Sequence, residues 1–239
     1  MNATKPYITI VIPCLNEQRT IGTCIRKASE VLREMAVPAE ILVADNGSSD
    51  DSERLARQHG ARVVRAPVRG NGNALRAGFR AANGRYLIMF DADDSYDISS
   101  IPTFLAYLEQ GYDLVIGNRF LGGIRPGAMP WSHRYFGNPL LSMIYKLLFR
   151  GKIGDINSGI RGIRRESLGK WDLRTSGMEF CAEMVVMATI RNMKIAEVPT
   201  VLFPDGRGRP SHLKTWRDGW RIFIFMLRIA VERKWLKKI

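Results

Sequence analysis

Short apolar runs alternate with stretches of helical periodicity through the first half of the chain. Five runs rich in β-branched residues are predicted to be strands: Tyr7–Ile12, Glu40–Ala44, Arg62–Ala66, Tyr86–Phe90 and Leu114–Ile116. Four stretches between them are predicted to be helices: Thr20–Met35, Asp50–His59, Asn73–Ala82 and Ile98–Glu109. Because such alternation builds a parallel sheet covered on both faces, and crossovers are right-handed, the sequence predicts a doubly wound, Rossmann-like α/β sheet.

The pattern changes after about residue 122. A Gly- and Pro-rich loop at Gly122–Pro130 is followed by an aromatic and apolar stretch, Trp131–Phe149. The later predicted elements are strands at Ile160–Ile163 and Ile195–Leu202 and helices at Phe180–Met193 and Thr215–Lys238. We therefore expect a mostly parallel sheet domain over residues 1–204, followed by a basic hinge and an amphipathic helix over residues 205–239.

The charge of the chain is strongly positive and uneven. The net charge is +13, and residues 205–239 hold ten Lys and Arg against three Asp and Glu. Such a balance indicates anionic partners, which include nucleic acid, an acidic membrane face and phosphate-bearing substrates. Charge alone does not choose among them.

Cysteine usage and hydropathy narrow the class of protein. The three cysteines, Cys14, Cys24 and Cys181, are scattered and odd in number, so we expect no disulfide framework and a reducing, cytosolic compartment. The longest apolar candidate, Ile222 to Leu227, is far shorter than the roughly 20 residues that a membrane-spanning helix needs. Any membrane association is therefore expected to be peripheral.

Polar clusters follow the first four predicted strands. They are Pro13–Glu17, Asp45–Asp50, Arg69–Ala74 and Asp91–Asp94. Each cluster alone could be turn chemistry, because Asn, Asp, Gly and Ser dominate turns. Open parallel sheets bind ligands outside the carboxyl ends of their strands. Four clusters at matching strand ends therefore predict one shared ligand-binding crevice.

The pair Asp91 and Asp93 is the sharpest of these features, because it follows a strand without charged residues. Two carboxylates this close raise each other's pKa unless a cation lies between them. A hard divalent ion such as Mg²⁺ or Mn²⁺, with a substrate diphosphate as a further ligand, removes that conflict. The alternative is a solvated acidic loop in which Asp94 or Asp97 caps the next helix.

Several common sites are excluded by the spacing of residues. Gly70 and Gly72 could allow the backbone to approach a phosphate or nucleobase closely, but Leu75 stands where a dinucleotide fingerprint needs its third glycine. The loop also lacks the Gly-Lys-Ser/Thr of a P-loop. The three histidines show no metal-ligand spacing with the cysteines, so neither a zinc site nor a Ser-His-Asp triad is expected.

Seven motifs together resemble a known family. Pro13-x-x-Asn16-Glu17, Asp45-x-Gly47-Ser48-x-Asp50, Gly70-x-Gly72-x-Ala74 and Asp91-x-Asp93 occur in this order in family 2 glycosyltransferases of the GT-A fold. Three later motifs resemble the polyprenyl-phosphate branch, the dolichyl-phosphate mannose synthases: Gly117–Phe120, Asn157–Arg161 and Arg207-x-x-Pro210–Leu213. The similarity covers about residues 6–225.

The resemblance implies a role for each matching residue. The donor nucleotide would be bound by Pro13, Asn16, Glu17, Asp45, Gly47, Arg69, Gly70, Asn73 and Asp91. Asp91 and Asp93 would hold Mg²⁺ or Mn²⁺, and the residues closest to the chemistry would be Asp93 and Arg119. The sugar diphosphate and the lipid phosphate would be bound by Arg119, Arg134, Ser158, Arg207, Arg209 and Ser211. Asp94-Ser95 and His212 depart from the branch's pattern, which leaves a third metal ligand and one phosphate contact open.

The implied activity is inverting transfer of a hexose from GDP-mannose or UDP-glucose to a dolichyl or undecaprenyl phosphate. An acceptor phosphate is mostly dianionic at pH 7, so the reaction needs no strong general base. The expected location is the cytoplasmic face of a membrane, held peripherally on anionic lipids. One alternative is a family 2 enzyme with a soluble or polysaccharide acceptor, which would need a base near Asp155 or Glu179. A remote alternative is a nucleic-acid-binding protein, which would leave Asp91 and Asp93 without a role; we expect no nucleic-acid partner.

The predicted last helix carries two different faces. At 100° per residue, one stripe holds the charged residues Arg217, Arg221, Arg228 and Glu232. Another face holds Trp216, Trp220, Phe223, Leu227 and Ala230. Such a helix fits a bilayer interface, although packing on the protein's own core is the competing interpretation.

Overall fold

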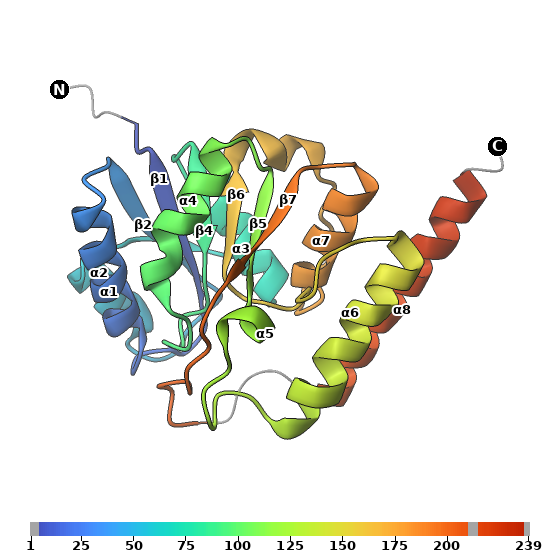
Figure 1. Ribbon diagram of the computed structural model, residues 1–239. Helices are drawn as coiled ribbons and strands as arrows, with labels where there is room; N and C mark the ends of the chain where they lie inside the picture. Colours follow the sequence, from blue (N-terminus) through green and yellow to red (C-terminus); the bar gives the residue numbers. More distant parts are fainter. Residues whose placement is uncertain (1–4, 210–214, 237–239) are drawn as a thin grey trace.

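The protein forms one mixed α/β structure around a seven-stranded sheet (Figure 1). The computed structural model describes residues 5–209 and 215–236. The strands are β1 (Ile8–Cys14), β2 (Ala39–Asp45), β3 (Arg62–Arg65), β4 (Tyr86–Met89), β5 (Leu114–Asn118), β6 (Arg161–Arg164) and β7 (Ile195–Pro199). Their order in the sheet is β3-β2-β1-β4-β6-β5-β7. All pairings are parallel except those of β6, which runs antiparallel to both β4 and β5.

The helices lie on both faces of the sheet (Figure 1). They are α1 (Ile21–Glu34), α2 (Ser52–Gln58), α3 (Asn71–Ala81), α4 (Ile101–Glu109), α5 (Arg119–Gly122), α6 (Asn138–Phe149), α7 (Phe180–Ile190) and α8 (Thr215–Leu236). A π-helical turn at His133–Gly137 precedes α6, so the apolar stretch after residue 130 is divided, and Pro139 lies in the first turn of α6. This architecture confirms the predicted mostly parallel α/β sheet with a C-terminal helix.

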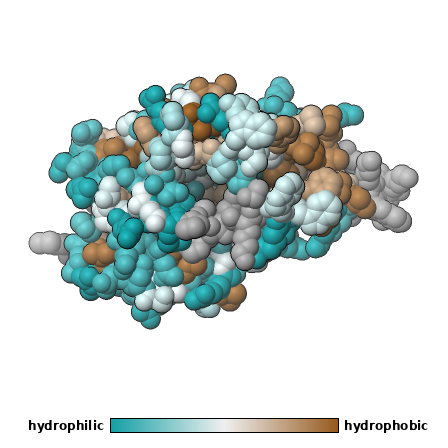
Figure 2. All heavy atoms as spheres, turned by 90° about the horizontal axis from the view of Figure 1, so that it is seen from below, coloured by the Kyte–Doolittle hydropathy of each residue, from teal (hydrophilic) through white to brown (hydrophobic). Residues whose placement is uncertain are grey.

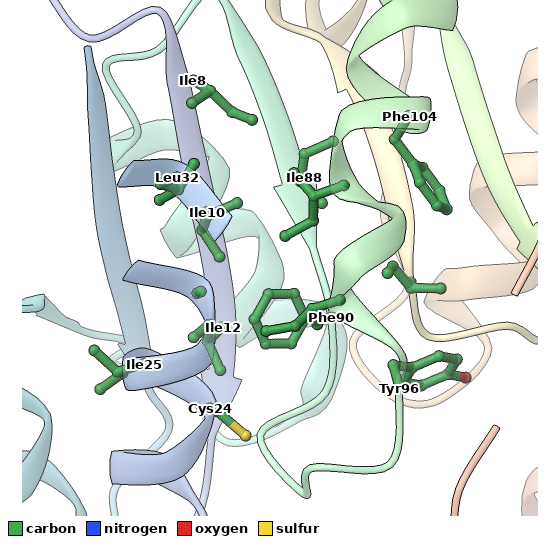
Figure 3. Packing of buried hydrophobic residues seen from close by; sticks show 14 of the residues in the cluster. Ile8, Ile10, Ile12, Cys24, Ile25, Leu32, Ile88, Phe90, Tyr96 and Phe104 are labelled. Carbon is green, nitrogen blue, oxygen red and sulfur yellow. The ribbon is translucent and has the colours of Figure 1, made fainter. Parts of the chain in front are cut away.

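The alternation of side chains along β1 divides the core into two layers. Ile8, Ile10 and Ile12 pack with Ile25 of α1 and with α4, and part of this layer is drawn in Figure 3. Val11 points to the other face, where it meets residues of α3, α6, α7 and α8. Both layers are closed to water, which explains why the strands appear in the sequence as continuous apolar runs.

Strand β6 lies between β4 and β5, and α4 packs closely over it. A Cβ on Gly162 would lie 3.0 Å from a methyl carbon of Leu108 on α4. The strand begins with Arg161, whose guanidinium is fully buried and donates to the backbone carbonyls of Ser158, Cys181 and Ile156. The sequence predicts a strand here, but not its antiparallel direction.

Helix α8 packs on the core through one face and exposes another. Ile222 and Met226 are buried with residues of α6 and α7. Trp216 is 90% exposed and Trp220 is 63% exposed. No helix among residues 5–209 and 215–236 is long and apolar enough to cross a membrane. The division of the chain at residue 204 stays a prediction.

Candidate functional site

The polar clusters predicted from the sequence meet at one edge of the sheet. Strands β1, β2 and β4 are parallel neighbours, so their carboxyl ends point the same way. The Asp45 carboxylate accepts the backbone N–H groups of Gly47 and Ser48, which closes the turn after β2. Asn16 after β1 accepts the Ser49 N–H at 2.8 Å and itself adopts a left-handed φ of 56°. The two loops are thereby locked together.

Asp91 and Asp93 follow β4 at the same edge. Asp93 is 8% exposed, and its Oδ1 accepts the Ser95 hydroxyl at 2.6 Å. Burial raises the pKa of Asp91, and the charge of Asp93 raises it further. A Cβ on Gly159 would lie 2.1 Å from Asp91 Oδ2, so only glycine allows that approach. The pair is therefore held close together in a site that favours an added positive charge.

The segment after β7 brings two arginines to these carboxylates. Arg207 Nη2 lies 3.1 Å from Asp93 Oδ2 and 3.0 Å from Asp205. Arg209 Nη2 lies 3.0 Å from Glu17 Oε1 and donates to the Asn16 carbonyl at 2.8 Å. The crevice therefore combines acidic groups after β1 and β4 with guanidinium groups from a loop distant in sequence.

Glu17 is the carboxylate on the β1 side of the crevice. Burial raises its pKa to about 7 against the opposing effect of the two arginines. Its Oε2 is buried and has no hydrogen-bond partner among residues 5–209 and 215–236, and the same holds for Nε of Arg207. The groups in this crevice thus retain unused hydrogen-bonding capacity.

The donor set suits a divalent ion shared with a substrate. Across the described parts of the chain, no group of three or more His, Cys, Asp and Glu side chains is arranged to hold a metal. Within the same residues, no hydrogen-bond donor reaches the Asp91 carboxylate. Mg²⁺ is typically bound through one or two carboxylates together with substrate phosphates and water. Asp91 and Asp93 fit that mode and do not form a complete protein cage.

The Gly70 and Gly72 loop approaches another part of the protein. Gly70 has a φ of 133°, and a Cβ there would lie 2.2 Å from the Ser176 carbonyl oxygen. The Gly72 N–H donates to that same carbonyl at 2.9 Å, and Gly70 N–H donates to Asn46 at 2.6 Å. The glycines therefore allow close packing of residues 175–176, while Arg69 beside them stays exposed. Whether the loop also contacts a nucleotide stays a prediction, as it does for Asn73, whose side chain bonds Arg76.

Arg119 begins α5 in a buried ion pair. Its Nε and Nη2 each donate to the Asp155 carboxylate at 2.7 Å, and its backbone N–H donates at 3.2 Å. The exposed fraction is 10% for the Arg119 side chain and 0% for Asp155. Glu197 of β7 accepts the N–H groups of residues 154 and 155, which fixes the position of Asp155. The sequence did not reveal this pairing, because 36 residues separate the partners.

The remaining predicted phosphate-binding residues lie in different settings. Arg134 is half-buried, donates to the Ile124 carbonyl at 3.5 Å, and stacks over Tyr135. Ser158 is fully buried, and its hydroxyl has no partner among the described residues. Ser211 lies outside the described residues. Pro13 lies within β1, paired with Ala44 of β2.

Comparison with known proteins points to one family. The family described as Glycosyl transferase family 2 matches residues 9–171. The low-salt glycan biosynthesis hexosyltransferase Agl6 of Haloferax volcanii is 34% identical over 93% of this chain, which spans about half (53%) of the length of Agl6. A dolichyl-phosphate hexose transferase of the same organism is 31% identical over 95% of both chains.

A solved structure extends the comparison to bound ligands. Glucosyl-3-phosphoglycerate synthase of Mycobacterium tuberculosis, in complex with Mn²⁺, UDP and phosphoglyceric acid, is 27% identical, with a TM-score of 0.66 over 86% of this chain and 72% of that chain. Another structure of that enzyme contains Mg²⁺ and UDP. These ligands agree with the divalent cofactor expected from Asp91 and Asp93. The family match over residues 9–171 and the relative that is 31% identical over 95% of both chains place the chain in glycosyltransferase family 2.

Proposed function

We propose that the protein transfers a hexose from a nucleoside diphosphate sugar to a polyprenyl phosphate with inversion at the anomeric carbon. The observation that carries the proposal is the acidic pair Asp91 and Asp93 beneath Arg207, at the edge where β1, β2 and β4 end. GDP-mannose and UDP-glucose are the candidate donors. The dolichyl-phosphate hexose transferase relative supports this acceptor class.

Departure of the nucleoside diphosphate is the step that the site assists. Asp91 and Asp93 would hold Mg²⁺ or Mn²⁺, which supplies positive charge to the leaving diphosphate when bound. Arg207 and Arg209 reach the same crevice and add guanidinium donors suited to phosphate oxygens. Stabilisation of developing charge by such groups is often the largest contribution to catalysis.

The acceptor phosphate attacks without help from a strong base. A phosphomonoester has a second pKa near 6, so at pH 7 it is mostly a dianion. The two residues that could act as a general base for a neutral acceptor both form ion pairs with arginines: Asp155 binds Arg119, and Glu179 lies 2.6 Å from Arg221. Their engagement supports a phosphate acceptor over a sugar hydroxyl.

The apolar surface of α6 and α8 supports a lipid acceptor. Large exposed apolar residues gather here: Trp131, Tyr135, Phe136, Leu140, Met143, Leu147, Trp216, Trp220 and Ile224. In Figure 2 the hydrophobic side chains gather at the end of the molecule where α6 and α8 lie. A hollow of about 310 Å³ between α5 and α6 is lined by Phe120, Pro139, Ser142, Met143, Lys146 and Gly154. We assign this side to the cytoplasmic membrane face.

The charged stripe predicted on α8 is less available to lipid headgroups than the sequence alone implies. Arg221 pairs with Glu179, Arg217 lies 3.2 Å from Asp218, and Arg228 lies 2.8 Å from Glu232. We therefore expect burial of apolar side chains in the bilayer interface to contribute more to membrane binding than the charges of α8 do. The charge of the whole chain adds attraction to anionic lipids.

The donor half of the proposal is tested with Asp93→Asn. Calorimetry with UDP and Mn²⁺ should show tight binding to the parent protein and at least about a tenfold loss in the variant, because one charged ligand is removed. Far-ultraviolet circular dichroism should be unchanged. Equal nucleotide affinity and equal turnover of the two proteins would disprove the metal role.

The acceptor half is tested with a short-chain polyprenyl phosphate, against free sugars and phosphoglyceric acid as competing acceptors. Product from the polyprenyl phosphate alone supports the proposal. Product from phosphoglyceric acid would favour the soluble-acceptor alternative, for which the solved glucosyl-3-phosphoglycerate synthase is the precedent.

Membrane association is tested separately by co-sedimentation with anionic liposomes at low salt. The double variant Leu147→Ser/Trp216→Ser should sediment less than the parent, because both side chains are exposed on α6 and α8. The matched control is Val68→Ser, which removes an apolar side chain that is 61% exposed elsewhere. Absence of binding by the parent protein would overturn the membrane assignment.

A further inference from the structure

A second basic hollow lies at the edge of the sheet opposite to the acidic pair. It has a volume of about 450 Å³ and is lined by Arg85, Arg164, Arg165, Glu166 and Gly169. Asp91 and Asp93 follow the carboxyl end of β4, whereas Arg85 directly precedes its first residue. The hollow is therefore separated from the transferase crevice by the length of a strand.

Pairing of β4 with β6 brings the three arginines together. Tyr86 lies opposite Arg164 in the antiparallel ladder, and the Arg165 N–H donates to the Arg85 carbonyl at 3.0 Å. A short 3₁₀ turn at Arg165–Lys170 then carries the chain over the edge. Residues distant in sequence are thus fixed side by side by backbone hydrogen bonds.

The guanidinium groups are only partly neutralised. Glu166 forms an ion pair with Arg164. Across the described residues, neither Arg85 nor Arg165 has a carboxylate within ion-pair distance, although Arg165 donates to the Ala82 carbonyl. Three cations and one anion leave the hollow with two uncompensated positive charges.

Arg164 reaches the hollow with only part of its side chain. Its Nε is buried and has no hydrogen-bond partner within residues 5–209 and 215–236, whereas the side chain as a whole is 26% exposed. Arginine is the residue best suited to bind phosphate through two parallel hydrogen bonds.

We propose that this hollow binds the phosphate of a small soluble phosphorylated molecule. Its volume falls within the range of small-ligand sites, roughly 300–1,000 Å³, and exceeds what a bare phosphate needs. A dianion matches the two uncompensated charges. None of the five lining residues carries an apolar side chain, so the hollow offers nothing to a lipid tail.

The test uses the full chain and inorganic pyrophosphate in the presence of EDTA, so that metal-dependent binding at Asp91 and Asp93 is suppressed. Calorimetry should show saturable binding, and Arg85→Gln/Arg165→Gln should weaken it about tenfold or more through loss of charge-assisted contacts. The control Arg54→Gln/Arg57→Gln removes the same charge from exposed positions on α2 and should bind like the parent.

A second measurement follows Arg164 directly. The Nε–H resonance of Arg164 should shift on addition of pyrophosphate, and the shift should disappear in Arg85→Gln/Arg165→Gln. Asp93→Asn should leave both signals unchanged, so failure of the proposed transferase function would not affect this result. Equal affinity of the two double variants, or the absence of saturable binding by the parent, would overturn the proposal.

Discussion

Removing one partner of the buried pair of Arg119 and Asp155 should be among the most destabilising single substitutions outside the apolar core. Asp155→Ala removes three hydrogen bonds and leaves the guanidinium buried without its paired carboxylate. Removing one partner of a buried pair typically costs about 3–5 kcal/mol, mostly because of the uncompensated charge. For a chain of this size we therefore expect the melting temperature to fall by roughly 6–20 °C.

Two further variants separate the charge from the shape of the site. Asp155→Asn keeps the volume and one acceptor oxygen, so its cost should be smaller than that of alanine. The exposed pair of Arg228 and Glu232 is the control: Glu232→Ala should cost about 0.3–0.5 kcal/mol at most, because solvent screens the pair.

Urea unfolding followed by circular dichroism measures all three free energies of unfolding. The denaturant slope should stay constant, which would show that the folded state itself has changed in stability. If Asp155→Ala lost less than about 1 kcal/mol, like an exposed pair, the argument from burial would fail.

Two other predictions concern packing and pH. Gly70→Ala should lower the free energy of unfolding by at least about 1 kcal/mol, because the residue has a φ of 133° and its Cβ would lie 2.2 Å from the Ser176 carbonyl oxygen. A Cβ on Gly169 meets nothing within 4 Å, so the control Gly169→Ala should be tolerated. Thermal unfolding of the two variants measures the difference. Burial acts to raise the pKa of Asp113, but the Ser167 hydroxyl, the Lys194 N–H and Lys170 lower it overall. The contribution of the Asp113 carboxylate to stability should therefore be complete above about pH 4 and lost as the pH falls through its folded-state pKa. Urea unfolding of Asp113→Asn and the parent from pH 7 to 3 should therefore show a difference that narrows with acid, and a difference independent of pH would contradict this assignment.

Local patterns were sufficient to predict the sheet and the edge at which the polar clusters meet. Ile8, Ile10 and Ile12 form a β-branched alternation within an apolar run, and the polar residues that follow mark where the strand ends. Once consecutive strands are parallel, their ends share one edge, so Asn16, Asp45 and Asp91 could be grouped without knowledge of their contacts.

Long-range pairings could not be predicted in the same way. Arg161 has the sequence signature of a surface residue, yet it is fully buried because three backbone carbonyls accept its guanidinium. The resemblance pointed to Arg207 as a phosphate-binding residue, but no pattern indicates that its guanidinium lies 3.1 Å from Asp93. Such positions depend on how loops cross the sheet edge, and that depends on many weak contacts at once.

The acidic pair and Arg119 therefore differ in physical origin. Asp91 and Asp93 are placed by strand register, since they continue a strand whose neighbours fix its position in the sheet. Arg119 is placed by buried polar contacts: Asp155 accepts its guanidinium, and Glu197 accepts the backbone N–H of Asp155. A substitution in a strand should consequently act through the whole fold, whereas Asp155→Asn should displace Arg119 and leave the acidic pair in place. Measured separately on that variant, nucleotide affinity should stay close to that of the parent, whereas acceptor affinity should fall.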